Sequence, residues 1–224
     1  MFFDMANNGY EQRTAWAGAG NGVLVYDPSG GAVTQADQVD FMLWDPAAKT
    51  DMQALENVFD SNHDGTLNAS DASWNNFRIL VTNANGTTTL ETLAQAGVTS
   101  INLTANAYEK ALPGGSSING ETSFTRSNGT SGTAATVTLA YGGGNYVVQQ
   151  TVTQNANGST TVQNNAYASD GSLAEQITSV TSANGLSKTT TYDFNGAGIV
   201  NKTETDVTVL NGDGSTTELS LIHI

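Results

Sequence analysis

The chain has 224 residues, of which 21 are acidic and 7 are Lys or Arg, so its formal net charge is -14. This charge excludes nucleic acid as a partner, because phosphates require a basic surface, and it favours the binding of cations. The chain contains no cysteine, which excludes disulfides and thiolate metal sites. Its frequent Thr, Ser, Asn and Gly residues are typical of a β-rich protein of extracellular character.

The two ends of the chain predict that it is a piece of a longer protein. Residues 1–4 have neither the basic nor the apolar region of a secretory signal, and no apolar run reaches the roughly 18 residues of a membrane-spanning helix. Residues 219–224 differ in composition from the Thr- and Gly-rich sequence before them, and they resemble the translation of a sequencing adapter. We interpret residues 219–224 as a read-through tail, with a natural amphipathic strand as the alternative.

The first predicted helix follows a short apolar run at residues 23–26. Asp45 is a suitable N-cap, and Pro46 suits the first helical position because its missing N–H costs nothing there. Apolar residues then recur at helical spacing. They are Met52, Leu55, Val58 and Phe59.

A second helix is predicted over residues 70–77, where Asn68 and Asp71 imitate a capping box. A strand at residues 79–81 and a turn at Asn85-Gly86 come next. A helical turn at residues 90–95, ended by Gly97, and a strand at residues 98–103 complete this part of the chain.

From about residue 106 onward, turn dipeptides separate runs of alternating Thr, Val and Tyr, which predicts an antiparallel meander. The turns are Asn157-Gly158, Asp170-Gly171, Asn184-Gly185, Gly196 to Gly198 and Asp213-Gly214. The expected fold class is therefore α+β and β-rich, with a small EF-hand-like helix-loop-helix packed on short strands and followed by β-hairpins. The expected domains are a calcium-binding module at residues 1–105 and a hairpin repeat region at residues 106–218.

Residues 60–71 fit the twelve-residue calcium-binding loop of EF-hand type. Gly65 at position 6 permits the sharp bend, Leu67 at position 8 turns into the core, and His63 at position 4 is expected to face solvent. Thr66 contributes its backbone carbonyl, and Asn68 acts through a water. The predicted ligands are Asp60, Asn62, Asp64, Thr66, Asn68 and Asp71.

Aspartate replaces the usual glutamate at position 12 of this loop, and its shorter side chain predicts a modest Kd of roughly 10⁻⁴ to 10⁻³ M for Ca²⁺. Two other segments have a similar spacing of Asp, Asn and Gly residues but fewer oxygen-bearing side chains. Residues 193–204 carry Ala197 at position 5, and residues 27–33 form half a loop that Asp37 could complete. The Asn- and Gly-rich stretch after Asp4 is interpreted as an ordinary turn.

The sequence predicts neither catalytic nor cofactor-binding residues. Its two histidines are His63, in the calcium loop, and His223, in the final six residues, so no nucleophile has an evident base. A carboxylate pair for glycoside hydrolysis stays open among the many acids, for which Glu91, Glu109 and Glu121 are candidates. We therefore expect a protein that is not an enzyme.

Much of the chain resembles modules of very large RTX-type, hemolysin-type calcium-binding proteins of Gram-negative bacteria. The segments that carry the resemblance are residues 9–18, 22–27, 44–46, 58–71, 74–86, 93–98, 182–187 and 206–209. The resemblance implies a secreted or cell-surface protein, exported by a type I route, that folds on binding calcium and has adhesin or toxin-like roles. The Gly-Gly-x-Gly-x-Asp nonapeptides of this family are absent, so no β-roll is expected.

The expected function is that of a non-enzymatic, calcium-binding structural segment of a large extracellular bacterial protein. The alternative is an adhesive or carbohydrate-binding module that uses the C-terminal sheet. A third hypothesis is dockerin-like docking to a partner protein, which is disfavoured because such modules generally use two calcium loops. The expected partners are the calcium ion and, through the parent protein, glycans or host-surface molecules, with no nucleic acid and no membrane span.

Overall fold

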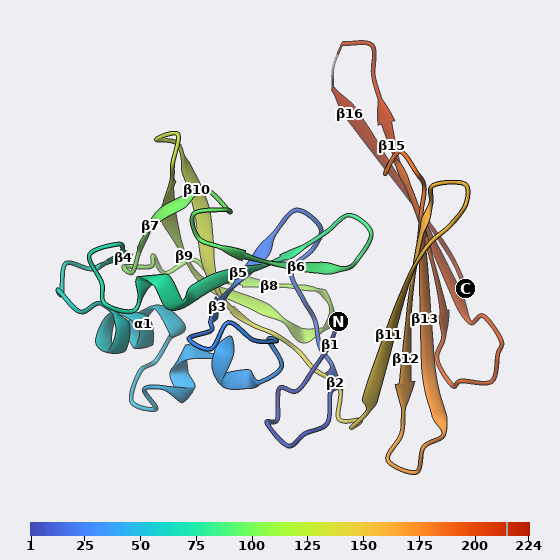
Figure 1. Ribbon diagram of the computed structural model, residues 1–224, viewed down its shortest axis with the longest axis horizontal. Coiled ribbons are helices and arrows are strands. Elements are labelled where there is room, and N and C mark those ends of the chain that lie inside the picture. The colour runs from blue at the N-terminus through green and yellow to red at the C-terminus, as the bar shows by residue number, and fades with distance from the viewer. Residues whose placement is uncertain (214) are drawn as a thin grey trace. The chain divides into compact units, whose positions relative to one another are not determined.

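The computed structural model describes residues 1–213 and 215–224, and it divides into two compact units (Figure 1). The first unit contains Met1–Val81 and Thr89–Gly143, and the second contains Thr82–Thr88 and Gly144–Ile224. The domain boundary expected at residue 105 falls within the first unit. Over the described residues, no helix is both long enough and apolar enough to span a membrane.

The first unit is built from three small antiparallel sheets. One pairs β1 (Phe2–Phe3) with β2 (Gln12–Arg13). The second has the order β3 (Gly22–Tyr26), β5 (Phe77–Thr82) and β6 (Thr88–Thr92). The third has the order β10 (Ser131–Thr138), β9 (Ser117–Arg126), β7 (Val98–Asn102) and β4 (Thr66–Asn68), with β8 (Lys110–Ala111) also paired to β9.

Short helical segments join these sheets. The described residues contain one α-helix, α1 (Asp51–Phe59). The 3₁₀ segments are η1 (Ala36–Gln38), η2 (Phe41–Leu43), η3 (Trp74–Asn76) and η4 (Pro113–Gly115).

The predicted fold class, α+β with an EF-hand-like helix-loop-helix, is wrong. The protein is mostly β, with 46% of its residues in strands and 9% in helices. The predicted second helix over residues 70–77 is reduced to η3, and Phe77 already begins β5. The preceding residues are rich in Ser, Asp and Asn, which hydrogen-bond to nearby backbone and disfavour helix interiors. The apolar residues that follow pair with β3 instead, as Leu24 does with Ile79.

The first helix begins at Asp51, five residues later than the predicted start at Pro46. Its N-cap is Thr50, whose hydroxyl accepts a hydrogen bond from the Gln53 N–H. Asp45 instead closes a local turn by accepting from the Ala47 N–H at 3.1 Å, and its other oxygen accepts from the Asn57 side-chain amide at 2.7 Å. The Asp45-Pro46 signal therefore marks a turn that leads into the helix. The helical turn predicted at residues 90–95 is displaced, since Thr88–Thr92 are strand β6 and a single turn follows in which the Ala96 N–H donates to the Thr92 carbonyl at 3.0 Å.

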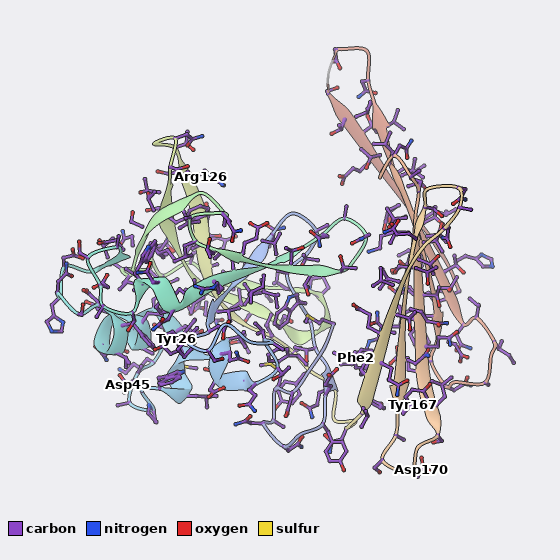
Figure 2. The ribbon with its side chains drawn as sticks, viewed as in Figure 1. Phe2, Tyr26, Asp45, Arg126, Tyr167 and Asp170 are labelled. Carbon is purple, nitrogen blue, oxygen red and sulfur yellow. The ribbon has the colours of Figure 1, made fainter. Side chains whose placement is uncertain are left out.

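The core of the first unit forms where α1 packs against the sheets. The buried face of the helix carries Met52, Leu55 and Phe59, one helical turn apart. Phe59 and Phe77 meet edge to face, with ring centroids 5.2 Å apart. Tyr26, which is partly buried and labelled in Figure 2, completes this aromatic cluster at 4.7 Å from Phe59. The core thereby holds the end of α1, from which the predicted calcium loop departs.

The second unit is a six-stranded antiparallel meander in which every strand pairs with its neighbours in sequence. Four of the five predicted turns connect successive strands, and in the fifth Gly214 lies outside the described residues. Residues 219–223 are paired within the last strand. The strands are β11 (Val147–Gln154), β12 (Thr160–Tyr167), β13 (Leu173–Thr181), β14 (Ser187–Asp193), β15 (Lys202–Leu210) and β16 (Thr216–His223).

Gly196, in the connection from β14 to β15, should not tolerate a side chain. It has φ +65°, and an added Cβ would overlap the carbonyl oxygen of Leu173. Gly198 in the same connection has φ +78° but open space around it. We expect Gly198→Ala to destabilise the protein by about 1 kcal/mol through backbone strain, and Gly196→Ala by about 3 kcal/mol because steric overlap is added. Urea denaturation followed by circular dichroism measures both, and equal losses would contradict the steric argument.

Candidate metal centre

The predicted calcium loop leaves α1 at its C-terminal end and leads into β4. Asp60 caps the helix, and its N–H donates to the Leu55 carbonyl at 3.2 Å. Two residues of the loop have left-handed backbone, His63 at φ +57° and Gly65 at φ +76°. A left-handed conformation is uncommon for a residue such as His63, so the loop is tightly constrained.

Asp60 organises the first half of the loop. The side chain is only 1% exposed. Its Oδ1 accepts from the Asp64 N–H at 3.3 Å, and its Oδ2 accepts from the Gly65 N–H at 2.8 Å. The carboxylate is thus held at the centre of the turn, where the first ligand of a calcium loop has to lie.

Asp71 closes the second half of the loop. It is also buried, at 4% exposure. Its Oδ1 accepts from the Ser61 N–H and its Oδ2 from the Asn68 N–H, each at 2.8 Å. One short carboxylate therefore joins both arms of the loop, a geometry that the sequence pattern did not predict.

Of the remaining predicted ligands, Asn62 and Asp64 are exposed, and Thr66 and Asn68 are half-buried in β4. The side-chain amide of Asn62 donates to Asp64 Oδ2 at 2.9 Å, and Asp64 Oδ1 accepts from the Thr66 N–H at 2.9 Å. The Thr66 carbonyl accepts from the Asn68 amide at 3.2 Å. In the part of the chain that the structure describes, no three His, Cys, Asp or Glu side chains are gathered as a metal site. The donors of residues 60–71 nevertheless fit Ca²⁺ chemically, since all are oxygens and three are carboxylates.

The loop is fastened to the five-stranded sheet. Leu67 is fully buried and pairs in register with Ile101 of β7. The Gly65 carbonyl accepts from the Leu103 N–H at 3.0 Å. Strand β7 of the same unit thus supports this loop.

Two other aspartates begin turns with the same hydrogen bonds. Asp4 accepts from the Asn8 N–H at 3.0 Å and the Gly9 N–H at 2.7 Å. Asp193 accepts from the Ala197 N–H at 3.2 Å and the Gly198 N–H at 2.6 Å. In each turn, as at Asp60, the fourth and sixth residues have positive φ. One sequence pattern would have identified all three turns. It is Asp followed by Gly five residues later, with Asn, His or Gly at the fourth position counted from the Asp.

Only the turn that begins at Asp60 has oxygen-bearing side chains at its first, third and fifth positions. The turn at Asp4 has Ala6 at the third position, and the turn at Asp193 has Ala197 at the fifth. The shared backbone geometry therefore does not by itself make a cation site. The number of ligands distinguishes Asp60–Asp71 from the other two turns.

The acids considered for glycoside hydrolysis lie on different elements. Glu91 is in β6, Glu121 is in β9, and Glu109 precedes β8. The two predicted half-loop acids, Asp27 and Asp37, lie after β3 and within η1, respectively.

Asp51, at the start of α1, should make the stability of the protein depend on pH. Burial and the nearby charge of Asp40 raise the pKa of Asp51 from 3.8 to about 6. The stability contributed by the protonated form is fully present below about pH 4 and is lost as pH rises through about 6. Asp51→Asn is therefore expected to stabilise the protein by about 2 kcal/mol at pH 7 and to have no effect near pH 4.

Denaturant titrations at both pH values test this expectation. Glu56→Gln is the matched control, because Glu56 is an exposed acid on the same helix. An Asp51→Asn variant that is equally stabilised or destabilised at pH 4 and pH 7 would contradict the pKa argument.

Comparison with known proteins matches the region that contains the loop to a sequence family. Residues 1–140 match the model of the SPM domain. The iron-regulated protein FrpA of Neisseria meningitidis serogroup C is similar, with 31% identity over 150 residues. The alignment covers 62% of this chain and 13% of FrpA. The chain thus spans about one eighth of the length of this curated relative.

Proposed function

The chain belongs to the SPM domain family, and we propose that it is a calcium-binding structural segment of a large secreted or cell-surface bacterial protein. The observation that carries the proposal is the loop at residues 60–71, in which the buried Asp60 and Asp71 carboxylates enclose further oxygen donors. The loop lies inside the region that matches the family model.

Bound calcium would take oxygens from the Asp60, Asn62, Asp64 and Asp71 side chains and the Thr66 carbonyl, with Asn68 acting through a water. A cation there would offset part of the net charge of -14. Because α1 precedes the loop and β4 ends within it, the cation would fasten the helix to the five-stranded sheet. A cation that binds only the folded chain stabilises it by an amount that rises with the logarithm of its free concentration above the Kd.

Two sequence observations support the large extracellular parent protein. Much of the chain resembles RTX-type, hemolysin-type calcium-binding proteins, and the similar FrpA is several times longer than this chain. A weak calcium loop suits the outside of a cell, where calcium is abundant. We therefore propose that this segment stays loosely folded until it binds extracellular calcium.

Isothermal titration of the full chain with Ca²⁺ tests the proposal at this loop. The wild type should bind with a Kd of roughly 10⁻⁴ to 10⁻³ M. Asp64→Asn should lose this binding event while keeping the hydrogen bond from the Thr66 N–H. Asp170→Asn is the matched control, since Asp170 caps an exposed hairpin tip of the second unit (Figure 2). Unchanged binding by Asp64→Asn would refute the assignment.

A further inference from the structure

The longest uncharged stretch of the chain covers one edge of the meander in the second unit. Residues 127–169 contain no Asp, Glu, Lys, Arg or His, although the whole chain has a net charge of -14. This stretch includes β11 and β12, which are the outermost strand of the meander and its neighbour. Two copies of an acidic chain repel each other, so a second copy meets the least repulsion at this edge.

β11 is an open edge strand without the usual protection against pairing. Within the described residues its only strand neighbour is β12. Natural edge strands are commonly protected by charged residues, proline or β-bulges. The opposite edge strand of the meander, β16, carries Glu218 and His223, and edge strand β10 of the first unit has a register shift between Thr136 and Val137. β11 has the uncharged sequence Val-Val-Gln-Gln-Thr-Val-Thr-Gln and an unbroken register with β12.

The backbone groups of the even-numbered residues of β11 face the open edge. The Asn155 N–H donates to the Ser159 carbonyl at 2.8 Å, and this pair continues the register of β11 with β12. In an antiparallel pair, residues that hydrogen-bond to the opposite strand alternate with residues that do not. The odd-numbered residues of β11 therefore bond to β12. The N–H and C=O groups that point away from β12 belong to Val148, Gln150, Val152 and Gln154.

The sequence of β11 is self-complementary about Gln150. When two copies of β11 run antiparallel with Gln150 opposite itself, Val148 of each copy lies opposite Val152 of the other. These residues are all even-numbered, so their backbone groups are the ones available for a new ladder. Their side chains share one face of the sheet, because successive side chains point to opposite faces. Val152 is 48% exposed, so pairing in this register also covers apolar surface.

We propose that β11 pairs with β11 of a second copy of this chain in this register, so that one sheet continues across both copies. Backbone hydrogen bonds supply the affinity in such strand addition, and the valine pairs fix the register. A two-fold contact is closed, so the assembly stops at a dimer and does not extend into a filament. The dimer contact lies in the second unit and goes beyond the calcium-binding function proposed for residues 60–71.

Sedimentation velocity of the full chain tests the dimer. The measurement is made at about 0.15 M salt, which screens the net charge, and up to about 0.5 mM protein, since small interfaces are weak. The wild type should shift from monomer to dimer as its concentration rises. Val152→Lys should raise the dimer dissociation constant at least tenfold, because it places a charge in the pairing edge.

Val209→Lys is the matched control for Val152→Lys. Val209 is 49% exposed, but it lies in β15, which has a strand on each side. The control should dimerise like the wild type, and circular dichroism checks that both variants are folded. A wild type that stays monomeric at every concentration, or an equal loss of dimer in both variants, overturns the inference.

A charge pair tests the register. Positions 148 and 152 lie roughly 13 Å apart along one strand, too far to pair within a chain, but they lie opposite each other across the proposed contact. Adding Val148→Glu to Val152→Lys should therefore restore the dimer. A double variant that dimerises no better than Val152→Lys overturns the register.

A cysteine at the two-fold axis provides a second measurement. The chain has no cysteine, so Gln150→Cys introduces its only thiol. Directly opposite residues of a hydrogen-bonded antiparallel pair have Cα atoms about 5.5 Å apart, which suits a disulfide. Mild oxidation should convert Gln150→Cys into a covalent dimer and leave Val209→Cys mostly monomeric. Equal yields from the two variants, or no covalent dimer from Gln150→Cys, would overturn the inference.

Discussion

Asp60→Ala is expected to remove the rise in melting temperature that calcium gives through the loop at residues 60–71. The substitution deletes the central ligand and also leaves the Asp64 and Gly65 N–H groups without their acceptor. The loss of two partly buried hydrogen bonds should destabilise the chain by about 2–4 kcal/mol even in chelator. Melting curves in excess Ca²⁺ and in excess chelator separate the two effects.

Asp4→Ala is the matched control for this experiment. Asp4 is buried and accepts the same pair of N–H groups, from Asn8 and Gly9, but its turn lacks the third-position oxygen. The control should lose stability by a similar amount in chelator and keep the full response to Ca²⁺. If Asp60→Ala retains that response too, calcium does not stabilise the protein through this loop.

Phe77→Ala should destabilise the protein by about 3–5 kcal/mol, which is the usual cost of removing a large aromatic side chain from a core. The side chain is 1% exposed, and its ring lies 5.2 Å from both Tyr26 and Phe59. Phe59 directly precedes Asp60, so the resulting cavity lies beside the start of the calcium loop. Chemical denaturation with and without Ca²⁺ measures the loss.

The control for this substitution is Phe194→Ala in the second unit. Phe194 is 46% exposed, so its removal leaves no enclosed cavity and should cost less than about 1 kcal/mol. Similar losses for the two variants would mean that the aromatic cluster around Phe77 is not the centre of the core.

The sequence predicted features that depend on a few neighbouring residues. The Asn-Gly and Asp-Gly turns of the second unit, such as Asn157-Gly158 and Asn184-Gly185, lie between successive strands. Both need only a glycine with positive φ and a side chain that bonds to nearby backbone. The bend at Gly65 was predictable for the same reason. The stretch after Asp4 was predicted as a turn, and it is one, but its shared backbone geometry with the loop at Asp60 was not predicted.

The helix boundaries and the fold class could not be predicted in this way. Asp45 and Pro46 would form a valid helix start in isolation, but in the folded protein the N-cap of α1 is Thr50. The residues after Asp71 would have to form a helix in an EF-hand, and the chain enters strand β5 instead. Leu80 is buried in that strand by pairing with Val23 of β3, far earlier in the chain. No short window of sequence contains that partner.

The sequence alone determined the composition of the candidate site, because twelve consecutive residues contain all of its oxygen donors and the glycine that bends them together. Tertiary structure decided what surrounds the site. The pairing of Leu67 with Ile101 supports the loop with a strand, and Asp71 bonds to both of its arms. The open edge at β11 is likewise visible only in the folded chain. Hydrogen bonds within a turn are encoded locally, whereas burial depends on segments that meet only when the chain folds.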